Sequence, residues 1–330
     1  MLVLGFESSC DETSISVSKD GKTILSNVVL SQIDIHKAFG GVVPEIASRE
    51  HVKGITIVLE EALQRANVKA GEIDLVAVTQ GPGLIGSLLT GINAAKAFAF
   101  VHQIPIIGVH HIAGHIYANQ IEQDMVFPLI CLVVSGGHTE LLLMNDHFDF
   151  EKLGETQDDA VGEAYDKVAR VLGLGYPGGP IIDRLAKQGK AVYPMPKVET
   201  KGDYDFSYSG LKSHVINTLN RLKMKKEAID HADMARSFQE AAIEQLIQKS
   251  QLALRNHQAK MFMVAGGVAA NSYLRKRVYE TFEDVIVAMP AMEYCTDNAA
   301  MMSIAGYYQY KKYGETTTMS LNGDSRLPLR

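Results

Sequence analysis

The sequence has no tryptophan and only three cysteines in 330 residues. Cys10, Cys131 and Cys295 lie far apart, at spacings that fit neither a disulfide framework nor a zinc ribbon. Few, unpatterned cysteines are typical of a protein in a reducing compartment, so we expect a cytoplasmic location. Each cysteine is expected to be a small buried apolar side chain.

Long hydrophobic runs are also missing. Gly, His or a charged residue interrupts every apolar stretch well before the ~18 residues that a membrane span needs. The segment Met1 to Phe6 lacks the basic and apolar regions of a secretory signal. We therefore expect neither export nor a membrane partner.

The net charge is −6, so the chain has no global basic field. A nucleic-acid partner would have to be held by a local basic patch or by another subunit. The sequence has 46% hydrophobic and 21% charged residues and no low-complexity tract, which excludes the disordered and fibrous classes. Because 330 residues exceed the usual size of one hydrophobic core, we expect two lobes.

A histidine pair marks the first half of the chain. His111 and His115 are four residues apart, which on a helix places both imidazoles on one face, with Cβ atoms roughly 5–6 Å apart. The apolar run 104–109 predicts a strand leading into that helix, a common place for sites in α/β proteins. Such a pair can bind a transition metal, but it also fits surface or hydrogen-bonded core histidines. A zinc protease is disfavoured, because Ile112 stands where the general-base Glu is needed.

One strand–turn–strand pattern occurs twice. Residues 2–6 form an apolar run, a polar turn follows, and residues 14–17 alternate as a returning strand. In the second half, the apolar run 129–134, the Ser-containing turn 135–139 and the apolar run 140–144 repeat this design. A duplicated hairpin of this kind predicts two homologous lobes that face each other across a cleft.

The remaining pattern predicts where the lobes divide. We expect a first lobe of residues 1–125 and a second lobe of residues 126–330, with a final helix at about 298–313 that packs back toward the first lobe. Helical spacing or composition predicts further helices, at 44–66, 84 to about 102, 158 to about 172, 209–222 and 232 to about 253. Three other segments are expected to lack regular structure: a glycine-rich loop near ligand at 173–183, a solvated basic turn at 223–226 and a loosely held tail at 319–330.

Glycine-rich turns follow two of the predicted strands, at 80–87 and 265–271. A strand that enters a glycine turn and then a helix can bind phosphate through free backbone N–H groups. The first turn matches neither the P-loop nor the dinucleotide fingerprint, and close helix–sheet packing explains its glycines equally well. In the second turn, Gly266 and Gly267 carry no Cβ, so the backbone could approach a flat ligand closely.

Asp297 allows two interpretations. It stands just before a predicted helix at 299–313, where Thr296 or Asp297 would be a natural N-cap. It could instead complete a metal site of two histidines and one carboxylate. Spacing alone favours the cap.

Five short motifs, spread along nearly the whole chain, occur together. They are GFESSCDET at 5–13, HH at 110–111 with His115, VSGGHT at 134–139, AGGVAAN at 265–271 and TDNAA at 296–300, with YPGGP at 176–180 and FSYSGLK at 206–212 between them. In this order they resemble the TsaD family, the bacterial relatives of the archaeal and eukaryotic Kae proteins. The resemblance implies an α/β, two-lobed fold of the actin, Hsp70 and sugar-kinase (ASKHA) type, with duplicated lobes around a cleft.

The resemblance also implies a function. The family's activity is that of a tRNA N6-adenosine threonylcarbamoyltransferase, an acyltransferase of tRNA modification. It transfers the threonylcarbamoyl group of threonylcarbamoyl-AMP to N6 of the adenosine 3′ to the anticodon in tRNAs that read codons beginning with A. A metal suits this acyl transfer, because negative charge develops on the carbonyl oxygen. The implied cofactor is one Fe2+ per chain, with Zn2+ as the alternative, and the implied protein partners are TsaB, as a heterodimer, and the ATPase TsaE.

The family pattern carries over to named positions. The implied metal ligands are His111, His115 and Asp297. Asp11, at the tip of the first hairpin, could accept a proton from the adenosine amine or organise the cleft. Many relatives carry Glu between the histidines where this chain has Ala113, which leaves the ligands intact but puts the tuning of the metal in question. The implied contacts of the adenylate intermediate are Val134, Ser135, Gly136, Gly137, His138, Asp166, Gly179, Asp183 and Asn271.

Two other functions compete. An ATP-driven kinase or ATPase could share the fold, but it would hold magnesium through carboxylates and water rather than through imidazole. A non-catalytic partner subunit of the same family would lack the metal histidines. His111 and His115 therefore argue against both.

Overall fold

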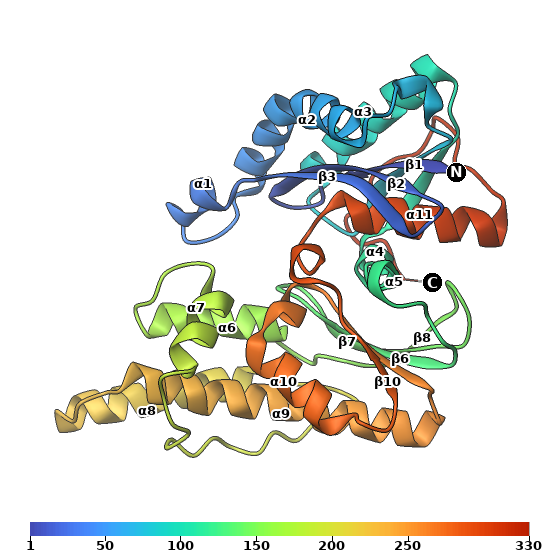
Figure 1. The fold of residues 1–330 in the computed structure, drawn as a ribbon. Coiled ribbons are helices and arrows are strands. Elements are labelled where there is room, and N and C mark those ends of the chain that lie inside the picture. Colours follow the sequence, from blue (N-terminus) through green and yellow to red (C-terminus); the bar gives the residue numbers. More distant parts are fainter. Residues whose placement is uncertain (330) are drawn as a thin grey trace. The chain divides into compact units, whose positions relative to one another are not determined.

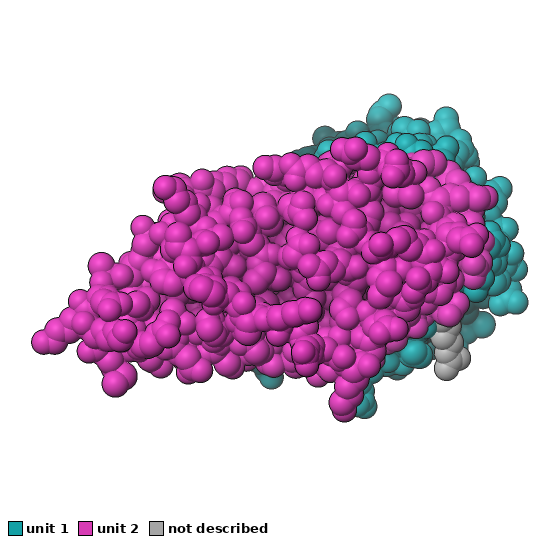
Figure 2. Space-filling model, turned by 90° about the horizontal axis from the view of Figure 1, so that it is seen from below, with its two compact units in different colours: residues 1–125, 146–149, 290–330 teal, residues 126–145, 150–289 magenta. Residues whose placement is uncertain are grey.

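The computed structural model describes residues 1–329, and its contacts divide the chain into two compact units. Unit 1 consists of Met1–Met125, Asp146–Asp149 and the chain from Pro290 onward (Figure 2). Unit 2 consists of Val126–Asn145 and Phe150–Met289. The C-terminal segment thus packs with the N-terminal part of the chain. The two units therefore cannot be separated by cutting the sequence at a single position.

A five-stranded sheet in the order β3-β2-β1-β4-β5 is the centre of unit 1. The strands β1 (Leu2–Glu7), β2 (Glu12–Lys19) and β3 (Thr23–Ser31) form an antiparallel meander. The strands β4 (Leu75–Gly81) and β5 (Ile106–His110) join β1 in parallel. Apart from Leu2, every residue of β1 is buried, because helices cover both faces of the sheet.

Helices pack on both sides of this sheet. The helices α2 (Pro44–Ala66) and α3 (Ile85–His102) lie together on one face, and α11 (Ala299–Tyr313) lies on the other (Figure 1). At Gly5, a Cβ would lie 2.4 Å from the carbonyl oxygen of Ala299. This close approach fixes the start of α11 against β1, and the short helices α1 (Ile33–Lys37), α4 (His111–Tyr117) and α5 (Asn119–Glu122) complete unit 1.

Unit 2 repeats the sheet of unit 1. Its strand order is β10-β9-β6-β7-β8, so an antiparallel meander is again followed by two strands added in parallel. The repeated hairpin found in the sequence therefore belongs to a repeated sheet. The strands are β6 (Leu129–Val134), β7 (Thr139–Met144), β8 (Phe150–Glu155), β9 (Met261–Ala265) and β10 (Ile286–Ala288).

The helices of unit 2 correct one prediction. Its helices are α6 (Val161–Val171), α7 (Gly178–Ala186), α8 (Ser209–Lys225), α9 (His231–His257) and α10 (Ser272–Thr281). The expected loop at 173–183 is wrong from Gly178 onward, where α7 begins. Pro177 is the residue before this helix and Pro180 lies in its first turn, where a missing backbone N–H costs no intrahelical hydrogen bond.

Two further segments, residues 223–226 and the C-terminal tail, are also better ordered than expected. Lys223 and Lys225 belong to the last turn of α8, and Lys226 is its left-handed C-cap. In the tail, Leu321 is buried in the core of unit 1, and its carbonyl oxygen accepts a hydrogen bond from Lys96 Nζ at 2.7 Å. The prediction of a loosely held tail is therefore wrong for residues 319–329, and Arg330 lies outside the described residues.

The remaining expectations about composition concern cysteines and membrane spans. Cys131 and Cys295 are buried and Cys10 is half-buried, and all three thiols are free. Within residues 1–329, no helix combines the length and the apolar character needed to cross a membrane.

Candidate metal centre and substrate residues

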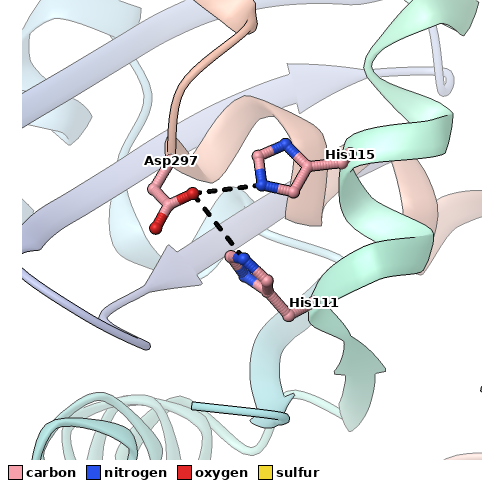
Figure 3. Close-up of side chains that lie close together, drawn as sticks. All are labelled: His111, His115 and Asp297. Carbon is pink, nitrogen blue, oxygen red and sulfur yellow. Dashed lines mark hydrogen bonds and ion pairs between the residues drawn. The ribbon is translucent and has the colours of Figure 1, made fainter. Parts of the chain in front are cut away.

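The histidine pair lies at a strand–helix junction of unit 1, as predicted. β5 ends at His110 and α4 begins at His111, and His110 Nδ1 caps the helix by accepting a hydrogen bond from the N–H of Ile112 at 3.1 Å. His115 follows one turn later, with its ring edge-on to that of His111 at 4.8 Å between centroids (Figure 3). The helical spacing therefore places both imidazoles together.

Asp297 faces these histidines and does not cap α11. The N-cap is Asn298, whose Oδ1 accepts a hydrogen bond from the N–H of Met301 at 3.2 Å, so the predicted cap at Thr296 or Asp297 is wrong. Asp297 Oδ1 lies 3.1 Å from His115 Nε2 and 3.6 Å from His111 Nε2 (Figure 3). The three ligand atoms all lie within 4.8 Å of one another, and all belong to unit 1.

This donor set fits a metal cation. Two imidazole nitrogens and one carboxylate oxygen suit Fe2+ or Zn2+. Burial alone would lower the pKa of His111, but the negative charges of Asp297 and Glu7 outweigh it and raise that pKa to about 9. The two carboxylates therefore favour positive charge at this point, which a bound cation would supply.

Glu7 is a site residue that sequence reasoning missed. Its carboxylate is fully buried at the end of β1, with Oε2 3.2 Å from His111 Nδ1. Thr79 Oγ1 donates to the same oxygen at 2.6 Å. Burial raises the pKa of Glu7, but the charge and hydrogen bond of His111 outweigh this effect, and the net pKa is lowered. Sequence reasoning assigned Glu7 to the polar turn. Its position directly after the apolar run 2–6 was the signal that could have identified it as a buried acid at the end of a strand.

The tip of the first hairpin is acidic and largely buried. Asp11 is 8% exposed, and its carbonyl oxygen accepts a hydrogen bond from the N–H of Gln32 at 3.0 Å. Burial, together with the charges of Asp297 and Asp11, raises the pKa of Glu12 to about 9. Burial and the charge of Asp11 also raise the pKa of the Cys10 thiol.

The predicted adenylate residues all lie in unit 2, and the first group forms a turn between β6 and β7. Ser135 Oγ accepts hydrogen bonds from the N–H groups of Gly137, at 3.3 Å, and His138, at 3.0 Å. A Cβ built on Gly136 or Gly137 would meet no atom within 4 Å. Hydrogen bonds within the turn after Val134 therefore hold its conformation, and the space beside Gly136 and Gly137 is open.

The second glycine turn lies beside the first. Gly266 has a φ of 92°, and a Cβ there would be 2.5 Å from the carbonyl oxygen of Val134, so only glycine fits. Asn271 caps α10, because its Oδ1 accepts from the N–H of Leu274 at 2.9 Å, while its Nδ2 donates to Gln239 Oε1 at 2.9 Å. Both ends of the Asn271 amide thus have partners within unit 2.

Hydrogen bonds also position the residues of α6 and α7. Asp166 Oδ1 accepts from the N–H of Gly178 at 2.7 Å, which ties α6 to the start of α7, and burial raises the pKa of Asp166. The carboxylate of Asp183 accepts from Ser272, through Oγ at 2.9 Å and through N–H at 3.2 Å, and so joins α7 to α10. Around a Cβ built on Gly179 there is no atom within 4 Å.

Solved structures share this fold at low sequence identity. Component A of the (R)-2-hydroxyglutaryl-CoA dehydratase of Acidaminococcus fermentans aligns with a TM-score of 0.54 at 16% identity, over 96% of this chain and 100% of that chain. Full-length HypF in its phosphate- and nucleotide-bound form aligns with a TM-score of 0.62 at 13% identity, over 95% of this chain and 47% of that one. Together with the repeated sheets, these similarities confirm the expected α/β fold of the actin, Hsp70 and sugar-kinase type.

Sequence relatives are much closer. The family model described as TsaD: tRNA N6-adenosine threonylcarbamoyltransferase matches residues 23–304. A protein of that name from Staphylococcus saprophyticus is 56% identical over 331 residues, which cover 99% of this chain and 96% of the relative. Another, from Anoxybacillus flavithermus, is 55% identical over 333 residues, covering 100% and 97%. The chain therefore belongs to the TsaD family of tRNA N6-adenosine threonylcarbamoyltransferases.

Proposed function

We propose that this chain transfers the threonylcarbamoyl group of threonylcarbamoyl-AMP to N6 of the adenosine 3′ to the anticodon in tRNAs that read codons beginning with A. Membership of the family supports the transferase activity and the tRNA acceptor. The structural observation that carries the proposal is the convergence of His111, His115 and Asp297, because an acyl transfer to a weakly nucleophilic amine benefits from a metal.

The proposed metal ligands are His111 Nε2, His115 Nε2 and the carboxylate of Asp297. Fe2+ is the proposed ion, with Zn2+ as the alternative, since both accept this donor set. Asp297 is 21% exposed at its side chain, whereas that of His115 is 2% exposed, so the carboxylate side of the site is the more accessible one. When bound, the ion would act as a Lewis acid toward the carbonyl oxygen of the threonylcarbamoyl group.

The reaction forms one bond and breaks one. N6 of the adenosine would bond to the carbamoyl carbonyl carbon, and the bond from that carbon to the phosphate oxygen would break, so that AMP leaves with the electron pair. The amine must also lose a proton. We assign Asp11 as the residue that accepts this proton or organises its path, because its side chain is an acid at the largely buried hairpin tip of unit 1.

We assign the adenylate intermediate to the two glycine turns and to α7 of unit 2. Open space beside Gly136, Gly137 and Gly179 supports this assignment, because a ligand there would meet backbone rather than side chains. Asp183 is assigned to a ribose hydroxyl. The full set comprises Val134, Ser135, Gly136, Gly137, His138, Asp166, Gly179, Asp183 and Asn271.

We also propose that the chain acts in the cytoplasm with TsaB and TsaE. The three free cysteines support the location. The support for a protein partner is a set of apolar side chains that α2 and α3 expose, among them Val52, Ile57 and Phe100, which are 65%, 63% and 73% exposed.

The test is a reconstituted reaction with synthesised threonylcarbamoyl-AMP and unmodified tRNA, with and without TsaB and TsaE. Mass analysis of the digested tRNA should show threonylcarbamoyladenosine. His111→Ala should keep much of the affinity for the adenylate and lose transfer, because metal stabilisation is largest where charge develops. A phosphorylated product, or full transfer by His111→Ala, would contradict the mechanism.

A further inference from the structure

Glu7 lies beside the candidate metal centre, and hydrogen bonds hold its carboxylate there. Its Oε1 accepts a hydrogen bond from the N–H of Ser9 at 2.5 Å. Its Oε2 accepts from Thr79 Oγ1 at 2.6 Å and lies 3.2 Å from His111 Nδ1. Backbone N–H and hydroxyl donors thus fix both carboxylate oxygens, and the oxygen facing His111 has a set position.

We propose that Glu7 is a positioning residue of the metal centre, which keeps the proton of His111 on Nδ1 and so leaves Nε2 as the metal-binding nitrogen. This inference rests on the proposed metal ligands. A carboxylate can only accept a hydrogen bond, so it favours the tautomer in which Nδ1 carries the proton. Nε2 of His111 is the nitrogen that faces Asp297. A histidine ligand commonly donates its other ring N–H in this way, which fixes both tautomer and ring orientation.

The second partner of His111 does not make this choice. Ser9 Oγ also lies 3.2 Å from His111 Nδ1. A hydroxyl can donate or accept, so Ser9 is compatible with either tautomer. Within the described residues, Ser9 Oγ and Glu7 Oε2 both lie within hydrogen-bond distance of His111 Nδ1, and of these two groups only the Glu7 carboxylate favours one tautomer over the other.

The isosteric variant Glu7→Gln therefore has a specific expected effect. The N–H of Ser9 is a fixed donor, so the glutamine oxygen should occupy the Oε1 position. The amide NH2 then faces His111, while the hydroxyl of Thr79 can rotate to accept. An NH2 group donates to Nδ1 and favours the proton on Nε2, which is the wrong tautomer for the metal.

The experiment measures Co2+ affinity of the full-length protein from the visible absorption of the bound ion. Glu7→Gln should bind Co2+ about 10–100-fold more weakly than wild type. Glu7→Ala should bind with intermediate affinity, since Ser9 Oγ can still accept from Nδ1, although this variant should be the less stable in urea. Glu283→Gln, an exposed residue of unit 2, is the matched control and should bind like wild type.

The order of the two variants separates positioning from packing. If Glu7 only supports the fold, metal affinity follows stability, and Glu7→Gln binds better than Glu7→Ala; that order would overturn the proposal. Equal affinity of wild type and Glu7→Gln would overturn it as well, while leaving the ligands in place. If wild type fails to bind Co2+, the proposed metal centre and this inference both fall.

A second measurement does not depend on whether the variants fold. In 15N-labelled wild type loaded with Zn2+, the ring nitrogen shifts of His111 should show the proton on Nδ1 and the metal on Nε2. A proton on Nε2 would overturn the proposal.

Discussion

Asp297 and Asn298 are neighbours that face different partners, and the pair offers the most direct test of the metal centre. We predict that the metal affinity of Asp297→Ala is lower than that of wild type by orders of magnitude. Its free energy of unfolding, measured without metal, should equal that of wild type. Asn298→Ala should keep the metal ligands and lose at least ~1 kcal/mol of unfolding free energy, because the N–H of Met301 loses its capping partner and the carbonyl oxygen of Thr296 loses its donor. Elemental analysis and urea denaturation with chelator present measure the two effects.

The same measurements apply to the histidines. His111→Ala and His115→Ala should each fold and contain no stoichiometric metal after purification. Full occupancy in either variant, or metal retained by Asp297→Ala together with a loss of stability, would remove the assignment of these three residues.

Asp183 and Ser272 separate ligand binding from structure in unit 2. Asp183→Ala should weaken binding of a stable threonylcarbamoyl-AMP analogue by about 1–3 kcal/mol, since a ribose hydroxyl loses its acceptor. It also removes the acceptor of Ser272. Ser272→Ala removes the hydroxyl contact and keeps the carboxylate, so it should retain most of the affinity. Calorimetric titration compares them, and equal losses in both variants would indicate that Asp183 acts only by joining α7 to α10.

Residue spacing predicted part of the candidate metal centre. The four-residue interval of His111 and His115 is a local property, so helical geometry alone brings the rings together. For Asp297, spacing favoured a helix cap, which Asn298 makes instead, because a cap and a ligand can occupy the same kind of position before a helix. Glu7 was missed because its hydrogen-bond partner Thr79 is 72 residues away in the sequence. The strand that carries Thr79 also helps to bury Glu7.

Among the elements, those with strong local signals were predicted best. α2 was expected at 44–66, and α11 at 299–313, and both have these bounds. Apolar residues at helical spacing mark α2, and a Pro at its start agrees with the preference for Pro in a first turn. α7 was missed because its first three residues, GGP, disfavour a helix interior, whereas at a helix start they are tolerated.

One buried histidine joins α2 to the tip of the first hairpin. His51 Nε2 lies 2.9 Å from the carbonyl oxygen of Cys10, which can only accept, so the proton is on Nε2. Thr13 Oγ1, 2.7 Å from Nδ1, then donates to the ring. The neutral ring satisfies both contacts, and burial favours it, because His51 is fully buried. α2 therefore helps to hold the turn that carries Asp11.

This contact predicts a pH dependence of stability. Burial lowers the pKa of His51, although the hydrogen bond to Cys10 and the charges of Glu7 and Asp11 oppose it. The unfolded chain then takes up a proton near pH 6.5 that the folded protein does not. The stability from neutral His51 is thus fully present above that pH and is lost as the pH falls toward the lowered pKa.

We predict that His51→Gln, which keeps a donor and an acceptor, loses less stability than wild type between pH 7.5 and pH 5.5. Urea unfolding of both proteins with chelator present measures the difference and removes the contribution of metal binding. Parallel pH profiles of the two proteins would contradict the prediction, because they would show that His51 binds protons equally in the folded and unfolded states in this range.

At the scale of the whole molecule, the repeated sheet was predictable from a repeated hairpin. Each hairpin is local in sequence, and its alternation and polar turn are visible without a structure. The return of the final helix to the first lobe was expected, but the contacts that hold it there, such as Gly5 with Ala299, join residues far apart in the sequence and no local pattern contains them. Likewise, Leu321 is one of several apolar residues in the tail, and only its neighbours in the folded core show why that tail is held.

The last prediction concerns the protein partner proposed for unit 1. The exposed side of α2 includes Val52, Lys53, Thr56 and Ile57, positions that recur with helical periodicity. Val52 and Ile57 are the apolar residues on this side, and exposed apolar surface of this kind can mark a binding site for another protein. We predict that the double variant Val52→Asp with Ile57→Asp keeps its fold and metal content but loses binding to TsaB.

Val192→Asp is the matched control, because Val192 is also exposed, at 54%, but lies in unit 2. Size-exclusion chromatography with added TsaB should show a heterodimer for wild type and for this control, and separate monomers for the α2 double variant. Two charges desolvated at an apolar contact would cost far more than the contact gains, so the loss should be complete at micromolar concentration. A heterodimer formed by the double variant would exclude this side of α2. An active wild-type monomer that is unchanged by TsaB would instead exclude the partner itself.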